Sequence, residues 1–196
     1  MQGRTLKSDL LILGPKVYSD AAFRSMKIPG LLQGDVATGV GVYISLPLNQ
    51  LEINVQIQAS APPTSTPLHA EALALSFAAK VAQKLNIIQP AFLMDCLSLA
   101  LVAASRKIQE STTPWSIRKS LANFFKCTTN LHPRVFHISR EVNGIAHNLA
   151  QQVFRLNDES QICCFASAHR HTSCPVVSLL SNFKVQKFRI HAVHCY

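Results

Sequence analysis

Alternating apolar and polar residues predict three strands at the start of the chain. Residues 51–59 read LEINVQIQA, in which the two kinds of side chain alternate as in a strand with one exposed face. Two shorter β-prone runs precede it, at residues 16–23 and 39–46. The short link at residues 47–50 predicts a hairpin turn between the second and third strands. We therefore expect a meander of three strands.

Helices and strands alternate in the rest of the predicted domain. The breaker-rich segment APPTSTP, residues 61–67, ends the meander. Helical spacing and apolar runs then predict, in chain order, a helix at 68–86, a strand at 87–94, helices at 97–108 and 115–126, a strand at 134–139 and a helix at 143–155. The order βββαβααβα predicts an α/β fold with a mixed sheet.

The composition changes near Leu156, and we divide the chain into three parts. Residues 1–14 form an N-terminal lead, 15–157 the predicted domain and 158–196 a Cys- and His-rich extension. The extension contains Cys163, Cys164, Cys174, Cys195, His169, His171, His191 and His194. Adjacent Cys163 and Cys164 lack the spacing of a zinc-binding pair, so zinc is the less favoured interpretation. A loosely ordered or strand-forming extension is expected, with one candidate strand at 185–193.

Composition limits the class of protein. Hydrophobic residues make up 48% of the 196 residues and charged residues 15%, which excludes a mostly disordered chain. No run is long and apolar enough for a transmembrane helix or a signal peptide. Together with reduced cysteines, this predicts an intracellular protein of the nucleus or cytoplasm. The net charge of +9 suggests an anionic partner, although a merely basic surface explains it equally well.

Acidic residues are scarce, and two of them stand in apolar runs. Only eight acids occur in residues 1–157. Asp20 lies inside a β-prone run, where Asp is disfavoured. Asp95 ends the apolar run AFLM, and the carboxyl end of a strand is where open α/β sheets place their ligands. The alternative for Asp95 is a helix N-cap.

Glu71 can be placed by helical geometry. The polar residues of helix 68–86 form one stripe, and Glu71 lies on the opposite side with Leu68 and Leu75. A carboxylate directed into an apolar interior is costly without a partner, and no Lys or Arg shares that face. A metal ion or a proton shared with another acid would satisfy it. The alternative is that Glu71, near the helix start, reaches water.

Three such carboxylates suggest a site for hard cations. Asp20, Glu71 and Asp95 can converge at one edge of the sheet, and clustered carboxylates favour divalent ions with oxygen ligands. A pair of Mg²⁺ ions at such a site would promote phosphodiester hydrolysis. A basic surface around it would hold a phosphate backbone.

Several short motifs together resemble a known family. They are YSDA at 18–21, GVGVY at 39–43, AEALAL at 70–75, MDC at 94–96 and NGIAHNLA at 143–150. In this order and spacing they are similar to the ribonuclease H-type domain of plant reverse-transcriptase-like proteins, which derive from non-LTR retroelements. The resemblance covers roughly residues 15–156.

The resemblance implies a ribonuclease H-like fold with a five-stranded mixed sheet whose second strand is antiparallel. It implies an endonuclease that cuts the RNA strand of RNA–DNA hybrids with Mg²⁺ or Mn²⁺. The catalytic and metal-binding positions of the family fall on Asp20, Glu71, Asp95 and His147. The last departs from the usual Asp: a neutral imidazole could bind an ion or relay a proton, but it adds no negative charge. His147 could instead be an exposed helical residue.

Two classes of function remain. The intact acids Asp20, Glu71 and Asp95 favour an active nuclease. His147 and the long loop before Glu71 favour a retroelement-derived domain that binds nucleic acid or a protein partner without cutting it. A membrane-surface protein is disfavoured, because no amphipathic helix concentrates Lys and Arg on its polar face.

Overall fold

One mixed sheet organises the molecule. The computed structural model describes residues 12–24, 38–48, 51–109, 111–156, 161–167, 173–185 and 187–196. Within these residues, seven strands lie in the order β5-β4-β1-β2-β3-β7-β6. The strands are β1 (Lys16–Phe23), β2 (Thr38–Leu48), β3 (Leu51–Ala61), β4 (Ala91–Met94), β5 (Arg134–His137), β6 (Gln161–Cys164) and β7 (Arg189–Cys195). The helices are α1 (Pro67–Lys84), α2 (Leu97–Ser105), α3 (Trp115–Thr128), α4 (Gly144–Gln152) and α5 (Pro175–Ser181).

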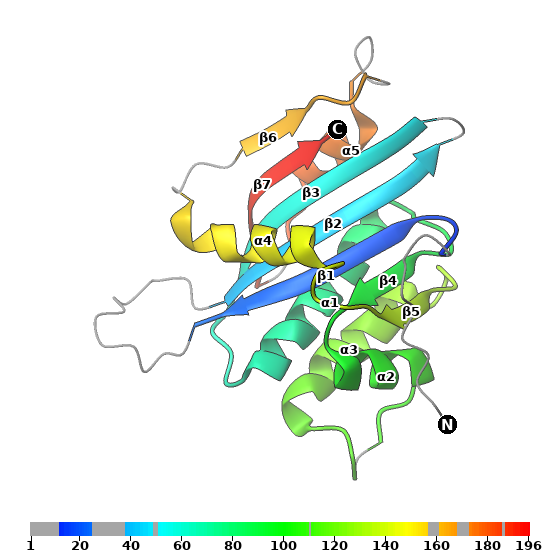
Figure 1. Cartoon of the computed structure of the whole chain (residues 1–196), viewed down its shortest axis with the longest axis vertical. Coiled ribbons are helices and arrows are strands. Elements are labelled where there is room, and N and C mark those ends of the chain that lie inside the picture. Colours follow the sequence, from blue (N-terminus) through cyan, green and yellow to red (C-terminus); the bar gives the residue numbers. More distant parts are fainter. Residues whose placement is uncertain are drawn as a thin grey trace.

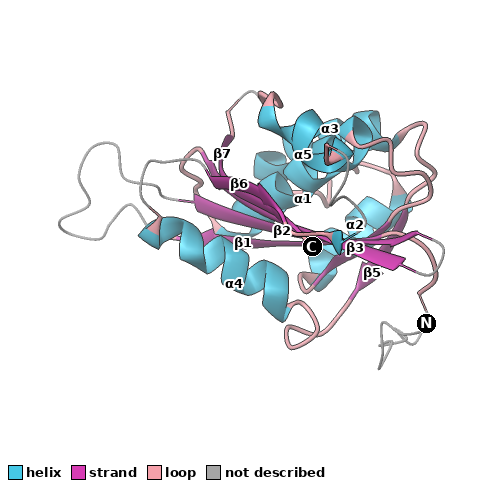
Figure 2. Cartoon of the chain, turned by 90° about the horizontal axis from the view of Figure 1, so that it is seen from above, coloured by secondary structure: helices cyan, strands magenta, loops and turns pink. Residues whose placement is uncertain are grey.

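The helices cover both faces of the sheet. Figure 2 shows α1, α3 and α5 on one face and α4 on the other. A short 3-10 helix, Val153–Arg155, continues α4. The main core lies between the sheet and α1, where the side chains of Phe77, Phe92 and Phe124 are fully buried. No helix in the described segments is both long enough and apolar enough to cross a bilayer.

The sheet is mixed because β1 has neighbours of opposite kinds. It pairs antiparallel with β2, as expected for a meander, and parallel with β4. Strand β4 in turn pairs parallel with β5. The predicted order of the first nine elements and the antiparallel second strand are confirmed (Figure 1). Leu48 pairs with Leu51 across the predicted hairpin, whose residues 49–50 lie outside the described part of the chain.

Helix α1 begins at a strong local signal. The side chain of Thr66 accepts a hydrogen bond from the backbone N–H of His69 at 3.1 Å, and Pro67 occupies the first turn. Both features stabilise a helix start, because the cap satisfies a free N–H and proline lacks one. The helix is rich in Ala, which allows it to pack closely on the sheet.

The resemblance predicts a sheet of five strands, and this number was wrong. Strand β7 pairs antiparallel with β3, and β6 pairs parallel with β7, which gives seven strands among the described residues. Without β7, the long strand β3 would leave a row of backbone N–H and C=O groups unpaired. The candidate strand at 185–193 coincides in part with β7, whereas β6 was not predicted. Strand β4 is also shorter than the predicted 87–94, because Gln89 has a φ of +53°, which is incompatible with an extended strand.

Candidate active site

Three elements bring three carboxylates to one point. Asp20 lies in β1 with its side chain fully buried, Glu71 is in the first turns of α1, and Asp95 follows β4. One carboxylate oxygen from each acid lies within 4.8 Å of the others. Because β1 and β4 are parallel neighbours whose pairing ends at Tyr18 and Leu93, Asp20 and Asp95 both follow the paired residues at the same end of the two strands.

Burial and mutual repulsion change the ionisation of the acids. The pKa of Glu71 is raised to about 10, first by burial and then by the negative charges of Asp20 and Asp95. Burial also raises the pKa of Asp20, while the hydrogen bond with His147 opposes that rise. Glu71 is therefore expected to hold a proton at neutral pH, since an ionised carboxylate would face two others in an environment of low polarity.

His147 lies beside the acids. Its Nδ1 atom is 2.7 Å from Oδ2 of Asp20, and its side chain is 25% exposed. It is therefore not a free surface residue of α4. The close approach of α4 to the sheet depends on Gly41, which pairs with Asp20 across β1 and β2. A Cβ atom at Gly41 would meet the Ala146 carbonyl and come within 2.6 Å of the Ala150 nitrogen.

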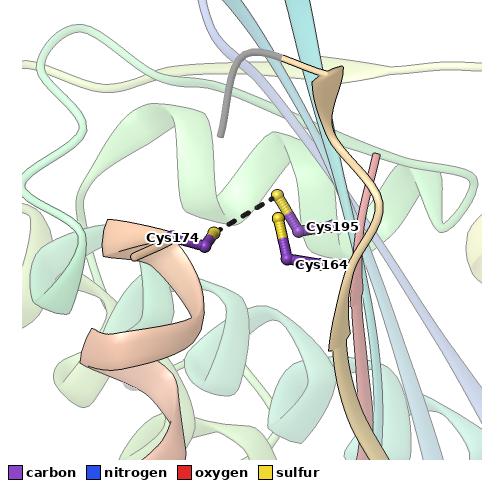
Figure 3. A group of neighbouring side chains, drawn as sticks. All are labelled: Cys164, Cys174 and Cys195. Carbon is purple, nitrogen blue, oxygen red and sulfur yellow. Dashed lines mark hydrogen bonds between the residues drawn. The ribbon is translucent and has the colours of Figure 1, made fainter. Parts of the chain in front are cut away.

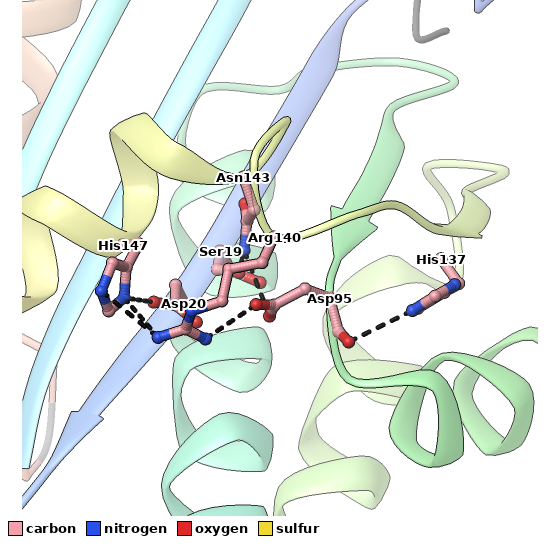
Figure 4. A network of polar contacts seen from close by, with 7 residues as sticks. All are labelled: Ser19, Asp20, Asp95, His137, Arg140, Asn143 and His147. Carbon is pink, nitrogen blue, oxygen red and sulfur yellow. Dashed lines mark hydrogen bonds and ion pairs between the residues drawn. The ribbon is translucent and has the colours of Figure 1, made fainter. Parts of the chain in front are cut away.

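Arg140 completes a polar network that the sequence did not reveal. Its guanidinium forms an ion pair with Oδ2 of Asp95 at 2.9 Å and lies 2.9 Å from Nδ1 of His147 (Figure 4). The side chain is 59% exposed, so the cation stands at the mouth of the acidic cluster. The available signal was a cationic residue seven positions before His147. Its partner Asp95 is 45 positions away, so spacing along the chain does not reveal the pairing.

Asn143 joins three segments of the site. This fully buried side chain donates a hydrogen bond through Nδ2 to the Ser19 carbonyl at 3.1 Å and approaches Oδ1 of Asp95 at 3.4 Å. It thereby fixes the start of α4 against β1 and the end of β4. The N-cap alternative for Asp95 was wrong, since Cys96 occupies the N-cap position of α2.

The donor set fits a hard divalent cation. Oδ1 of Asp20 is buried and has no hydrogen-bond partner among the described residues. A buried carboxylate oxygen without a partner is costly, and it lies where Glu71 and Asp95 also present oxygen atoms. Three carboxylates at this spacing match the oxygen ligands that Mg²⁺ and Mn²⁺ prefer. Asp20, Glu71 and Asp95 could therefore hold such an ion.

The fold is that of a ribonuclease H-like domain. LC11 ribonuclease H1, isolated from compost by a metagenomic approach and solved with an RNA/DNA hybrid, superimposes with a TM-score of 0.54 at 18% identity, over 72% of this chain and 96% of that one. An N-terminal ribonuclease H domain from Mycobacterium tuberculosis gives a TM-score of 0.52 at 16% identity, over 72% and 93% of the two chains. Prototype foamy virus protease-reverse transcriptase gives 0.52 at 18% identity, over 74% of this chain but 21% of the viral one.

The chain belongs to the reverse transcriptase-like family, whose model matches residues 30–153. This match and the structural similarities confirm the resemblance to ribonuclease H-type domains that the motifs indicated. Among curated proteins, none matches the sequence.

Proposed function

We propose that the protein is a metal-dependent endonuclease that hydrolyses the RNA strand of RNA–DNA hybrids. The observation that carries this proposal is the convergence of Asp20, Glu71 and Asp95 on a ribonuclease H-like fold. Structural neighbours of the same fold have been solved with RNA/DNA hybrids, namely LC11 ribonuclease H1 and the foamy viral protease-reverse transcriptase. A hybrid can be told from duplex DNA by its shape and its 2′-hydroxyl groups, without reading of its sequence.

Asp20, Glu71 and Asp95 would hold Mg²⁺ or Mn²⁺, with His147 next to them. When bound, the ion would polarise the scissile phosphate and lower the pKa of the attacking water. Glu71 has to give up its proton to act as a ligand, so its raised pKa links metal binding to pH. The buried position of Asp20 keeps its carboxylate fixed before any substrate arrives.

The residues around the acids have separate tasks in this proposal. His147 can relay a proton next to Asp20, because its Nδ1 atom lies 2.7 Å from Oδ2 of that carboxylate. Arg140 places a positive charge at the exposed edge of the cluster, where it would stabilise the negative charge of a bound phosphodiester. Asn143 holds the start of α4 against Ser19 of β1 and against Asp95, which follows β4. The products would carry 5′-phosphate and 3′-hydroxyl ends.

Cleavage of a labelled RNA–DNA hybrid in Mg²⁺ or Mn²⁺ tests this proposal, with EDTA as the metal-free arm. Asp95→Asn should reduce the rate at least about a hundredfold, as removal of a charge-stabilising group does in other enzymes. Hybrid binding by this variant should stay near that of the unmodified protein. Glu52→Gln is the matched control, because Glu52 is an exposed acid of β3 that accepts a hydrogen bond from Ser45. This variant should cut the hybrid at the rate of the unmodified protein.

A binding module without catalysis is the second candidate. The observation that favours it is the position of the Arg140 guanidinium between Asp95 and His147. Its positive charge offsets the negative charge of Asp95, which a second metal ion would need for binding. Folded protein that binds hybrid tightly but cuts no strand in either metal would establish this candidate. Equal cutting by Asp95→Asn and the unmodified protein would instead refute the assignment of the acids.

A further inference from the structure

A second group of metal-ligating side chains lies in the extension. It consists of Cys164 at the end of β6, Cys174 just before α5 and Cys195 at the end of β7. Their sulfur atoms all lie within 4.8 Å of one another (Figure 3). All three residues follow the segment 30–153 that the family model matches, so the ribonuclease H-like fold does not account for them.

The separation of the sulfur atoms suits coordination. The Sγ atoms of Cys174 and Cys195 are 3.8 Å apart. A metal–sulfur bond of about 2.3 Å gives an edge of about 3.8 Å between two sulfurs in a tetrahedral site and about 4.0 Å in a trigonal one. The observed distance is nearly twice the roughly 2.05 Å of a disulfide bond. No disulfide bond joins any of the described cysteines.

Regular structure places the three thiols on one side of the sheet. Cys164 and Cys195 are partners in the parallel pair of β6 and β7, so their side chains point to the same face. Cys163 precedes Cys164 in the same strand and therefore points to the opposite face. The third thiol, that of Cys174, lies across from these two where the chain enters α5, to the left of the strands in Figure 3.

The surroundings favour sulfur as a ligand. The backbone N–H of Val177 donates to Sγ of Cys174 at 3.4 Å, which stabilises negative charge on that sulfur. Val176 and Leu180 of α5 are buried in the same apolar core cluster as Cys174 and Cys195, which limits the access of water to these two thiols. Thiolates select soft ions such as Zn²⁺ and Cu⁺, whereas the carboxylates of the first site select hard ones.

We propose that Cys164, Cys174 and Cys195 form a binding site for a thiophilic metal ion, Zn²⁺ or Cu⁺, which fastens α5 and β6 to β7. Three thiolates complete the coordination of Cu⁺. Zn²⁺ would take a fourth ligand from outside the trio. Binding releases the thiol protons, so it strengthens as the pH rises. The site is separate from the acidic cluster and stabilises the extension whether or not the protein cuts RNA.

Titration of the reduced, metal-free protein with Cd²⁺ tests the proposal directly. Cd²⁺ bound to thiolates gives an ultraviolet sulfur-to-metal absorption that carboxylate ligands do not produce, so binding at Asp20, Glu71 and Asp95 is not counted. We expect one ion per chain with the intensity of three thiolates. Displacement of Cd²⁺ by Zn²⁺ in one arm and by Cu⁺ in another then identifies which ion binds more tightly.

Variants distinguish the site from unspecific thiol binding. Cys164→Ser, Cys174→Ser and Cys195→Ser should each weaken Cd²⁺ binding at least about tenfold. The matched control is Cys163→Ser, the neighbouring thiol on the other face of β6, which should bind as the unmodified protein does. Cys164 is partly exposed, so its substitution tests the site even if replacement of fully buried Cys195 unfolds the extension.

Three results would overturn the proposal. The first is a folded, reduced protein that shows no thiolate absorption with Cd²⁺. The second is equal loss of binding in Cys163→Ser. The third is a Cys174–Cys195 disulfide in the isolated protein whose reduction yields no metal binding. None of these results bears on the nuclease, whose failure would show only in the cleavage assay.

Discussion

The fold strongly alters the ionisation of the Glu71 side chain. Its pKa rises from an ordinary value of 4.5 to about 10, because burial and two neighbouring carboxylates oppose its charge. Below about pH 4.5 the residue is protonated in both the folded and the unfolded chain. Between the two values the folded protein binds more protons, so stability falls as the pH rises.

Glu71→Gln should therefore remove a pH dependence of stability. Gln keeps the shape of the protonated carboxyl but does not titrate. In EDTA, the free energy of unfolding of the unmodified protein should decrease relative to the variant as the pH rises from about 5 toward 10. Urea denaturation at several pH values measures this difference. Parallel pH profiles of the two proteins would contradict the raised pKa, and Glu52→Gln serves as the control that keeps the profile.

Arg140 should compete with cations for the acidic cluster. Its guanidinium pairs with Asp95, so a cation binding there has to replace or share that charge. Arg140→Gln should lower the Mg²⁺ concentration for half-saturation about two- to fivefold, the small effect expected for an exposed ion pair. Calorimetric titration with Mg²⁺ measures it. Lys119→Gln removes one exposed charge of α3 and should leave Mg²⁺ binding unchanged. Weaker Mg²⁺ binding in Arg140→Gln would contradict the prediction.

The sequence was informative for some of these residues and silent for others. Helical periodicity alone predicted that the Glu71 side chain points toward the sheet. Asp20 was conspicuous because Asp is unfavourable in a strand. Arg140 could not be found in this way, since its pairing with Asp95 joins segments 45 positions apart. The group of three sulfurs in the extension does not follow from zinc-ligand spacing along the chain, because β6, α5 and β7 bring the cysteines together only in space.

The contact of α4 with β2 controls the geometry of the site at the scale of elements. Gly39 and Gly41 leave no side chain between the strand and the helix, and a Cβ atom at either position would meet the α4 backbone. The strand places Gly41 next to Asp20, while the helix carries His147. The distance from β2 to α4 therefore sets the distance between the carboxylate and the imidazole.

Gly41→Ala should push α4 away from the sheet. We expect a loss of about 1–3 kcal/mol in stability, as for other overpacked interiors, and a larger relative loss of hybrid cleavage than of hybrid binding. The control is Gly144→Ala in the first turn of α4, where a Cβ atom meets nothing within 4 Å. That change should be neutral or add up to about 1 kcal/mol. Thermal unfolding and cleavage rates measure both variants, and unchanged values for Gly41→Ala would disprove the close contact.

Prediction of elements succeeded where a segment was long and strongly patterned. Helix α1 begins and ends within two residues of its predicted bounds, because Thr66 and Pro67 mark its start and its apolar stripe is continuous. Strand β6 has four residues, QICC, which is too short for an alternating pattern to be recognised. It exists because β7 lies beside it, and that pairing cannot be read from the local sequence.

The charge of the whole molecule should govern its affinity for hybrids. The chain carries 19 Lys and Arg against 10 Asp and Glu, a net charge of +9. Each phosphate that is neutralised releases counterions, so hybrid binding by Asp95→Asn should weaken as salt increases. A fourfold increase in salt should cost about tenfold in affinity for every two phosphates contacted. Fluorescence anisotropy at several salt concentrations measures the slope, and a salt-independent affinity would exclude the phosphate backbone as the main contact.

The pairing of β3 with β7 also has a consequence for the order of folding. Strands β2 and β3 are neighbours in sequence and can form a hairpin quickly, whereas Gln56 of β3 meets His194 of β7 across more than a hundred residues. Until β7 docks, β3 offers a full row of hydrogen-bonding groups to any extended segment nearby. Refolding of this protein is thus a kinetic competition between closure by its own distant strand and capture by another molecule.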